Sequence, residues 1–363
     1  MRIPSLQLSS GLLALQGVLI SSTRAIPDEH GVVAEPDRAP LHPHSTCADV
    51  LRWTPSRQEP AIVLQVVSKS FVYVQENFLI LMEERSCFTR ENLYLMCLDD
   101  DARATMADEG IPCVPIHRVK SLRQLWNLRV HTLGCLLAGG WNVFLSDSDA
   151  LWLSDPIVDM ALAGVNEIDI VTQRGGYPYK QNDEWGVTMC MGFALFRSRD
   201  REGMALYQNA MRENIAKTGD DQVALNMAAY NLGVVWDQSS DMNFYNSTGI
   251  GKGIVTSLPG NFTVALLPHS KYIRHCDETP ISNDTVVAHC RSRKKDGDKL
   301  RWMKSAHLWN VDDTSVKGTK ESRGKEARGD TGGNEEHKTR NNGDPGKMAE
   351  SSRGSAKISE TAA

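Results

Sequence analysis

The stretch GGWNVFLSDSDALWLSDPI, residues 139–157, decides the fold class. Its apolar centre, residues 141–145, has the length and composition of a buried central strand. Two glycines precede this strand as a helix stop, and the acidic pair Asp147 and Asp149 follows it. In open α/β sheets, ligands bind beyond the carboxyl ends of strands, which is where this pattern puts the two carboxylates. The stretch therefore predicts an α/β domain with an acidic site at a strand end.

Strand-like and helix-like segments alternate on both sides of this stretch. Short apolar segments rich in strand-forming residues predict strands at 61–67, 93–98, 168–172 and 191–196. Apolar residues at helical spacing predict helices at 71–84, 102–109, 122–138, 201–216 and 221–232. This alternation is typical of βαβ units, so we expect a single domain with a Rossmann-like, mostly parallel sheet flanked by helices. Residues 174–185 are expected to form a loop.

The composition changes at both ends of this unit. Residues 1–25 contain a short apolar run and small residues before a possible cleavage point, which predicts a signal peptide or a short signal anchor. The run is shorter than the roughly 20 residues of a spanning helix, so both alternatives stay open. Residues 26–58, rich in proline and charge, predict a stem or linker. Residues 314–363 have almost no large apolar side chains and predict a disordered tail, which leaves 59–313 as the folded domain.

Composition and sequons predict the compartment. The net charge of −5 over 363 residues and the lack of a basic stripe argue against nucleic acid as a partner. Three Asn-x-Ser/Thr sequons, at Asn246, Asn261 and Asn283, agree with the signal-like start. We therefore expect the chain in the secretory pathway, in the Golgi lumen, either soluble or attached to the membrane through its N-terminal segment.

The eight cysteines form no Cys-x-x-Cys pair, which disfavours a zinc ribbon or a thioredoxin-like site. In an oxidising lumen some should pair, and Cys276 with Cys290 is a plausible bridge. Cys97 and Cys135 lie in apolar runs and are expected to be buried thiols. Trp141, Trp152 and Trp309 are expected to be core residues.

The spacing of Asp147 and Asp149 suits one hard divalent cation. Carboxylates at i and i+2 at a strand exit can converge on Mn²⁺ or Mg²⁺ and leave coordination positions for diphosphate oxygens. His289, after a predicted strand at 285–288, could complete the site with a neutral imidazole. Alternatively, the aspartates cap the next segment, and His289 is a hydrogen-bonded core or surface histidine.

Residues 139–157 resemble the Gly-aromatic, apolar strand, Asp-x-Asp, Trp-Leu and Asp-Pro run of the nucleotide-diphospho-sugar transferase domain. The chain is similar to glycosyltransferase family 77, a resemblance that spans roughly residues 61–310 and implies a GT-A fold with retaining, α-linkage chemistry. Further motifs follow in the family's order: Cys190-Met191-Gly192-Phe193 with Arg197, the Asp-Gln motif at 220–226, and the closing residues His289, Gly297, Lys299 and Trp309.

The resemblance implies a role for each matching residue. The metal ligands would be Asp147, Asp149 and His289, the catalytic pair Asp221 and Gln222, and the donor-binding residues Arg129, Asp147, Gly192, Gly297 and Lys299. The residue types fit these roles, since cationic side chains bind diphosphate oxygens and a carboxylate or amide can stabilise an oxocarbenium-like centre. The alternatives are solvated helix faces for Arg129 and Lys299 and helix capping for Asp220 and Asp221. One departure is Cys190-Met191, where many relatives carry a polar residue that reaches the donor sugar.

The sequence therefore predicts a metal-dependent enzyme that transfers a sugar from a UDP-sugar to a glycan or glycoprotein acceptor. A haloacid-dehalogenase-like phosphohydrolase is the alternative enzyme, in which Asp147 would attack phosphorus. That nucleophile normally closes the first strand of its domain, whereas two strand and helix units precede Asp147 here. The third possibility is an inactive, secreted carbohydrate-binding relative.

Overall fold

The computed structural model describes residues 40–42, 44–117, 119–199, 201–245, 247–276, 280–290 and 297–311. All of them belong to one unit. The predicted signal or anchor, the first part of the predicted stem (26–39), the sequon residue Asn246 and the predicted tail lie outside the described residues. Among the helices of the described part, none has the length and apolar character needed to cross a membrane.

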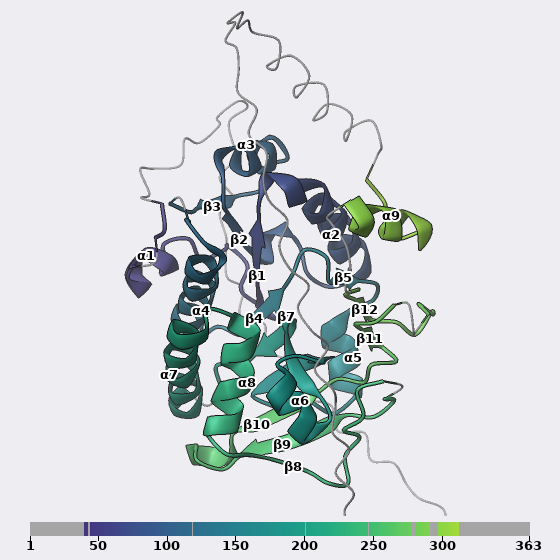
Figure 1. The fold of residues 1–363 in the computed structure, drawn as a ribbon. Helices are drawn as coiled ribbons and strands as arrows, with labels where there is room; N and C mark the ends of the chain where they lie inside the picture. Colours follow the sequence, from purple (N-terminus) through teal and green to yellow (C-terminus); the bar gives the residue numbers. More distant parts are fainter. Residues whose placement is uncertain are drawn as a thin grey trace, which may run out of the picture. The chain divides into compact units, whose positions relative to one another are not determined.

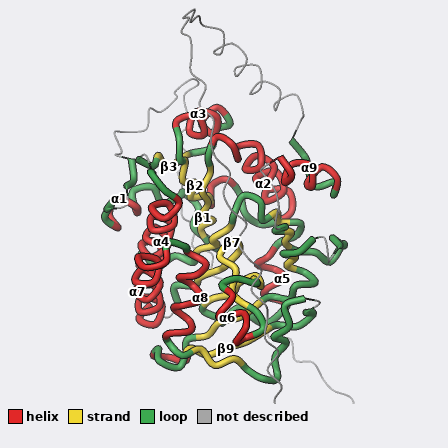
Figure 2. The backbone as a smooth tube through the Cα atoms, in the orientation of Figure 1, coloured by secondary structure: helices red, strands yellow, loops and turns green. Residues whose placement is uncertain are grey.

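A nine-stranded sheet forms the centre of the described residues (Figures 1 and 2). Its strands, in spatial order, are β3 (Cys113–Pro115), β2 (Leu93–Cys97), β1 (Ile62–Val67), β4 (Val143–Ser146), β7 (Thr188–Phe196), β6 (Ile170–Gly175), β10 (Thr263–Leu266), β9 (Gly251–Val255) and β8 (Val234–Trp236). Of these strands, β7 and β9 run opposite to the others. This confirms the predicted α/β class with a mostly parallel sheet.

The order of the first four strands creates a switch point between β1 and β4. The chain steps outward from β1 through β2 to β3, then returns to pair β4 with the other side of β1. Connections leave in opposite directions at such a point, which opens a crevice beyond the carboxyl ends of the two strands. The acidic pair follows β4 directly and lies at that crevice.

Helices cover both faces of the sheet (Figure 1). One apolar core packs against α1 (Cys47–Leu51), α4 (Leu122–Ala138), α7 (Arg201–Thr218) and α8 (Asp221–Asn231), with Trp185 of α6 (Tyr179–Trp185) at its margin. The core of the other face packs against α2 (Val72–Arg85), α3 (Asp100–Asp108), α5 (Pro156–Leu162) and α9 (Gly297–Ser305). Short 3₁₀ turns lie at Lys69–Phe71, Arg90–Asn92 and Pro259–Asn261. Strands β1, β4 and β7 are almost wholly buried, as expected for a sheet with both faces covered.

Local sequence signals fix the two helices that bear site residues. α4 begins where the side chain of Ser121 accepts a hydrogen bond from the Gln124 amide, and it ends at Gly139. α8 begins at an equivalent cap, in which the carboxylate of Asp220 accepts from the Val223 amide at 2.8 Å. Such caps satisfy amides that have no partner within the helix. The predicted capping role is therefore confirmed for Asp220, which leaves Asp221 to make other contacts.

A second, three-stranded sheet joins the end of the domain to its middle. Its order is β11 (Tyr272–Ile273), β12 (Val287–Ala288) and β5 (Leu151–Trp152). In this sheet Ala288 pairs with Leu151 and Val287 with Trp152. His289 follows β12 and Asp149 closely precedes β5, so this pairing brings the histidine next to the acidic pair.

Residues 40–58 differ from the predicted linker. Thr46 and Asp49 form a capping box at the start of α1, and Leu41 and Val50 are fully buried against the domain. A disulfide joins Cys47 of this segment to Cys135 of α4. The prediction followed the proline and charge that dominate the composition here. A few apolar residues are nevertheless enough to attach the segment to the domain.

Two further predictions are corrected. Cys97 and Cys135 are not thiols, because Cys97 pairs with Cys113 on the neighbouring strand and Cys135 pairs with Cys47. Apolar surroundings suit a buried disulfide as well as a buried thiol. The predicted bridge Cys276–Cys290 is confirmed.

The expected loop at 174–185 is wrong as well, since 174–175 belong to β6 and 179–185 form α6. Trp152 is fully buried, as predicted.

Candidate active site

The acidic pair lies on a tight turn between β4 and β5. The Asp147 amide donates to the Gly192 carbonyl of β7 at 2.8 Å, and the Asp147 carbonyl accepts from the Ala150 amide at 2.9 Å. Between the two aspartates, the Ser148 hydroxyl donates to Gln75 of α2 at 2.7 Å, inside the protein. Ser148 therefore anchors the turn inward, and the two carboxylates remain on the site side.

His289 faces both carboxylates. Its Nε2 atom lies 3.6 Å from Oδ2 of Asp147 and 3.5 Å from Oδ1 of Asp149. One ligand atom from each of the three residues lies within 4.8 Å of the others. Two hard oxygens and one imidazole nitrogen at such separations are a fitting set for a divalent cation such as Mn²⁺. The structure thus brings together the three residues that the sequence predicted as metal ligands.

Gly192 makes this convergence sterically possible. A Cβ atom at this position would lie 2.6 Å from Oδ2 of Asp147 and 2.9 Å from Nδ1 of His289, far inside contact distance. The glycine forms the floor beneath both side chains, on the central strand β7. Its role in donor binding stays a prediction, and its role in giving the ligands room follows from the geometry.

Arg129 of α4 connects two carboxylates that are distant in sequence. Its Nη2 atom donates to Oδ1 of Asp147 at 2.8 Å and to the Met191 carbonyl at 3.3 Å, while Nη1 lies 3.2 Å from Oδ2 of Asp221. Only 4% of the Arg129 side chain is exposed. The alternative of a solvated helix face is therefore wrong for Arg129, whose guanidinium is an internal part of the site.

Asp221 is buried behind this guanidinium. Burial raises the pKa of Asp221 to about 6, and the nearby carboxylates of Asp147 and Asp220 reinforce this shift against the opposing effect of Arg129. The Asp221 carboxylate faces Arg129 inside the protein. The sequence had predicted it as one of the two catalytic residues at the reacting sugar.

Gln222, the next residue on α8, points toward β7 and the segment after β6. Its Oε1 accepts from the Met191 amide at 3.4 Å, and its Nε2 donates to the Tyr177 carbonyl at 2.6 Å. Gln222 remains partly exposed, unlike Asp221. It is the member of the predicted catalytic pair that can reach a bound molecule.

Lys299 of α9 forms an ion pair with Asp149 on the outer side of the site. Burial raises the pKa of Asp149, but the adjacent His289 and Lys299 outweigh it and hold that pKa below its usual range. The Lys299 ammonium also lies 5.4 Å from the centre of the Phe71 ring. Gly297 is the first residue of α9, two residues before Lys299.

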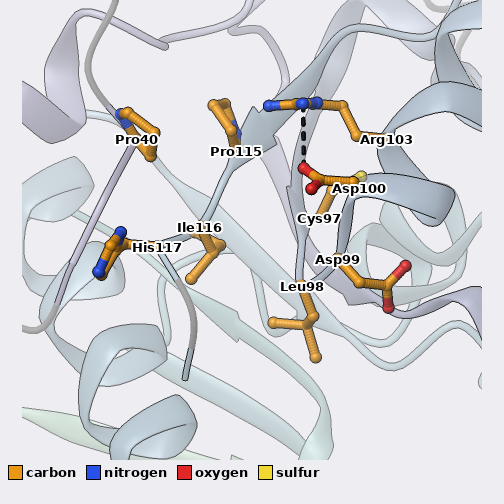
Figure 3. Close-up of a pocket in the computed structure, with 9 residues that line it drawn as sticks. All are labelled: Pro40, Cys97, Leu98, Asp99, Asp100, Arg103, Pro115, Ile116 and His117. Atoms are coloured by element: carbon orange, nitrogen blue, oxygen red, sulfur yellow. Dashed lines mark ion pairs between the residues drawn. The ribbon is translucent and has the colours of Figure 1, made fainter. Parts of the chain in front are cut away.

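Cavities continue along the same edge of the sheet, beside the acidic site rather than over it. One cavity of about 380 Å³ lies where β2 and β3 end (Figure 3), and its lining residues are Pro40, Cys97, Leu98, Asp99, Asp100, Arg103, Pro115, Ile116 and His117. Within it, Arg103 and Asp100 form an ion pair at 3.0 Å. The carboxyl edge of the strands therefore offers room as well as charge.

The model of the nucleotide-diphospho-sugar transferase family matches residues 90–303, which is more than half of the chain. The chain belongs to the nucleotide-diphospho-sugar transferase family. All the residues that the sequence predicted as functional fall inside the matched range. The predicted family is thus confirmed at this level, and membership supports a glycosyltransferase that uses a nucleotide-sugar donor. No curated protein matches this transferase-family chain.

Several solved structures are similar to this family member. The apo form of mouse xyloside xylosyltransferase 1 has a TM-score of 0.30 and 11% identity, covering 47% of this chain and 81% of the mouse chain. The glycosyltransferase GlyE of Streptococcus pneumoniae TIGR4 has a TM-score of 0.39 and 11% identity, and the match covers 72% of this chain and 63% of GlyE. The galactosyltransferase LgtC, solved with donor and acceptor sugar analogs, has a TM-score of 0.34 and 10% identity. The match covers 70% of this chain and 99% of LgtC. Values this low carry no argument about substrate.

Two buried glutamines of this transferase-family chain escaped the sequence analysis. Gln75 supports Ser148 from α2, and Gln173 of β6 accepts from the His289 ring at 3.1 Å. Both are fully buried. Neither stands out in the sequence, because Thr172 and Arg174 flank Gln173 and the polar pair 76–77 follows Gln75, so no local signal could have found them.

Replacing Gly192 with alanine tests the steric argument. The added Cβ must displace Asp147 or His289, so we expect Mn²⁺ affinity, measured by isothermal titration, to fall at least about tenfold. Gly134→Ala is the matched control, because its Cβ would meet only the Gln208 Oε1 atom, at 3.7 Å. Equal Mn²⁺ affinities for the two variants would contradict the argument.

The raised pKa of Asp221 predicts a pH dependence of stability. Between pH 4 and 6 the unfolded chain releases the proton while the folded protein keeps it, so rising pH favours unfolding over this window. The free energy of unfolding of the wild type, relative to Asp221→Asn, should therefore fall from pH 4 to pH 6 and level off above it. Urea denaturation of both proteins across this range measures the difference. A difference that stays constant, or one that rises with pH, would show that Asp221 does not have a raised pKa.

Proposed function

We propose that this chain transfers a sugar from a UDP-sugar to a glycan or glycoprotein acceptor in the lumen of the secretory pathway, with Mn²⁺ or Mg²⁺ as cofactor. The observation that carries the proposal is the convergence of Asp147, Asp149 and His289 at the switch point of the sheet. Two cationic side chains, Arg129 and Lys299, flank these ligands. Cations and acidic metal ligands together suit a diphosphate better than an uncharged substrate.

The metal would be held by Asp147, Asp149 and His289, whose ligand atoms fit a divalent cation in type and separation. When bound, such a cation neutralises the charge that develops on a departing nucleoside diphosphate, so the leaving group needs no proton donor. The ligands start from favourable positions. The Gly192 floor and the Ser148 anchor already hold the acidic turn in place, which lowers the ordering cost of binding.

Lys299 is placed to respond to the donor. In this structure it pairs with Oδ2 of Asp149, whose Oδ1 faces His289, and a metal in the site would compete with it for this carboxylate. Its ammonium would then be available to diphosphate oxygens at the edge of the site. Arg129 cannot move in this way, because it is buried between Asp147 and Asp221, so we assign it to holding the acidic turn rather than to direct contact with phosphate.

Retention of configuration would place a polar group of the protein near the reacting carbon. Gln222 fits this position, since it is partly exposed and its amide is oriented at both ends, by the Met191 amide and the Tyr177 carbonyl. Asp221 would act one step removed, through its ion pair with Arg129. The assignment to glycosyltransferase family 77, and with it the α-linked product, is part of this proposal.

The phosphohydrolase alternative is less well supported. Its nucleophile would be Asp147, whose Oδ1 accepts a hydrogen bond from Arg129 and whose Oδ2 faces His289. A carboxylate held by Arg129 at one oxygen, with the other beside the nitrogen of His289, suits a metal ligand better than a nucleophile for phosphorus. The nucleoside of a sugar donor, by contrast, would find room in the cavities along the same strand edge.

Calorimetry with UDP tests the proposal. Titration of the full chain should show binding that depends on Mn²⁺, and Asp149→Ala should weaken this binding at least about a hundredfold, since it removes a ligand that bridges metal and protein. Asp108→Ala, at an exposed position of α3, is the control and should leave binding unchanged. If UDP fails to bind wild type with Mn²⁺, or binds equally without metal and in the Asp149 variant, the proposal is wrong.

A further inference from the structure

Gln173 contacts the Nδ1 edge of the His289 imidazole. It sits on β6 between Thr172 and Arg174, where the pairing register of β6 with β7 shifts. Such an irregularity re-aims a side chain relative to regular pairing. The Gln173 side chain is completely buried, and its Oε1 lies 3.1 Å from Nδ1 of His289. Nothing in the proposed function accounts for a buried amide at this point.

The orientation of this amide follows from its second contact. The Gln173 Nε2 atom donates to the Ile273 carbonyl at 2.9 Å, and a carbonyl can only accept. The oxygen of the amide must therefore face His289, and because that oxygen also only accepts, Nδ1 of His289 must carry the proton. In the neutral ring this leaves the lone pair on Nε2, the atom that faces Asp147 and Asp149.

The Ile273 carbonyl accepts hydrogen bonds from both residues of this pair. The Ile273 carbonyl accepts from the backbone amide of His289 at 2.9 Å as well as from the Gln173 side chain. Strand β11 therefore positions both the backbone and the ring of His289. The backbone is held directly and the ring through Gln173. The register between β6, β11 and β12 thereby sets where the Nε2 lone pair points.

We propose that Gln173 is a positioning residue, which holds His289 in the Nδ1-protonated tautomer and directs the Nε2 lone pair to the divalent cation. The inference rests on the proposed metal site. It deepens that site because hydrogen bonds to the far nitrogen of a metal-bound imidazole fix its tautomer and orientation. The Cys190 thiol and the Arg274 side chain are the other groups near this histidine. The thiol is the competing candidate for fixing the tautomer.

The tautomer can be observed in the metal-free protein. With ¹⁵N-labelled histidine, long-range ¹H–¹⁵N correlation spectra at alkaline pH, where the imidazole is neutral, should show His289 protonated at Nδ1 and not at Nε2, with His289→Gln providing the assignment. Gln173→Leu, of similar size, should lose this single state. Gln173→Glu keeps an acceptor facing Nδ1 but loses the donor to the Ile273 carbonyl, and should keep Nδ1 protonated. A spectrum unchanged in Gln173→Leu would assign the tautomer to Cys190 or to the metal ligands and overturn the proposal.

Mn²⁺ affinity gives the second readout. We expect Gln173→Leu to bind Mn²⁺ about 10- to 100-fold more weakly than wild type, and Gln173→Glu to stay within about threefold. Gln208→Leu is the matched control, since it removes another buried amide, on α7, and should leave Mn²⁺ affinity unchanged. Thermal unfolding of each variant confirms that a folded protein is compared. Gln173→Glu keeps the hydrogen bond from Nδ1 of His289 and loses the one to the Ile273 carbonyl.

The two readouts separate this proposal from the proposed function. Wild type that binds no Mn²⁺ would overturn the metal site, whatever the tautomer. Wild type that binds Mn²⁺, together with a Gln173→Leu variant of equal affinity and unchanged tautomer, would overturn only the role of Gln173.

Discussion

The guanidinium of Arg129 is a permanent cation buried in the centre of the domain, and the active site is arranged around it. A charge with so little exposure is tolerated only when carboxylates and carbonyls surround it, and removing one partner of such a pair typically costs about 3–5 kcal/mol. Asp147, Asp221 and the Met191 carbonyl fill that need. The same contacts tie α4 to the turn after β4, to β7 and to the start of α8. Electrostatic necessity thus fixes three separate segments at one point.

The second constraint is the small sheet that returns the end of the domain to its middle. β12 pairs with β5, so the histidine that follows one strand meets the acidic turn that precedes the other. Gly192 lies beneath both and leaves them the space of a side chain. The chemistry therefore depends on residues separated by more than a hundred positions, whose spacing is set by backbone pairing. The proposed metal site thus depends on strand register as much as on ligand identity.

Much of the first half of the fold follows from local sequence. The apolar strand before Asp147, the helical spacing of apolar residues in 122–138 and the stop at Gly139 are local patterns, and the structure has a helix and a strand where they predict them. Within the predicted linker, the part that the structure describes, 40–58, differs from the prediction for the opposite reason. Leu41 and Val50 belong to a short, largely polar segment, and their burial depends on partners beside β3 and in α4 that no local pattern reveals.

The candidate site divides in the same way. Residue type and motif order sufficed to bring Asp147, Asp149 and His289 together as a hypothesis, and the geometry agrees with it. The inward orientation of Asp221 and the part played by Gln173 could not be predicted, because both depend on three-dimensional neighbours. Asp221 meets Arg129 from a different helix, and Gln173 meets His289 from a different sheet. The motif indicates which residue types form the site. The contacts of Asp221 and Gln173 depend on elements that are distant in sequence.

The central claim is that Asp147, Asp149 and His289 bind one divalent cation that also contacts a nucleoside diphosphate. Pulsed electron paramagnetic resonance of Mn²⁺ bound to the full chain with UDP tests it most directly. The account predicts a ¹⁴N coupling from one imidazole, absent in His289→Ala, together with ³¹P couplings from the diphosphate. Mn²⁺ that shows ³¹P couplings but no ¹⁴N coupling, or a ¹⁴N coupling that persists in His289→Ala, would contradict the account.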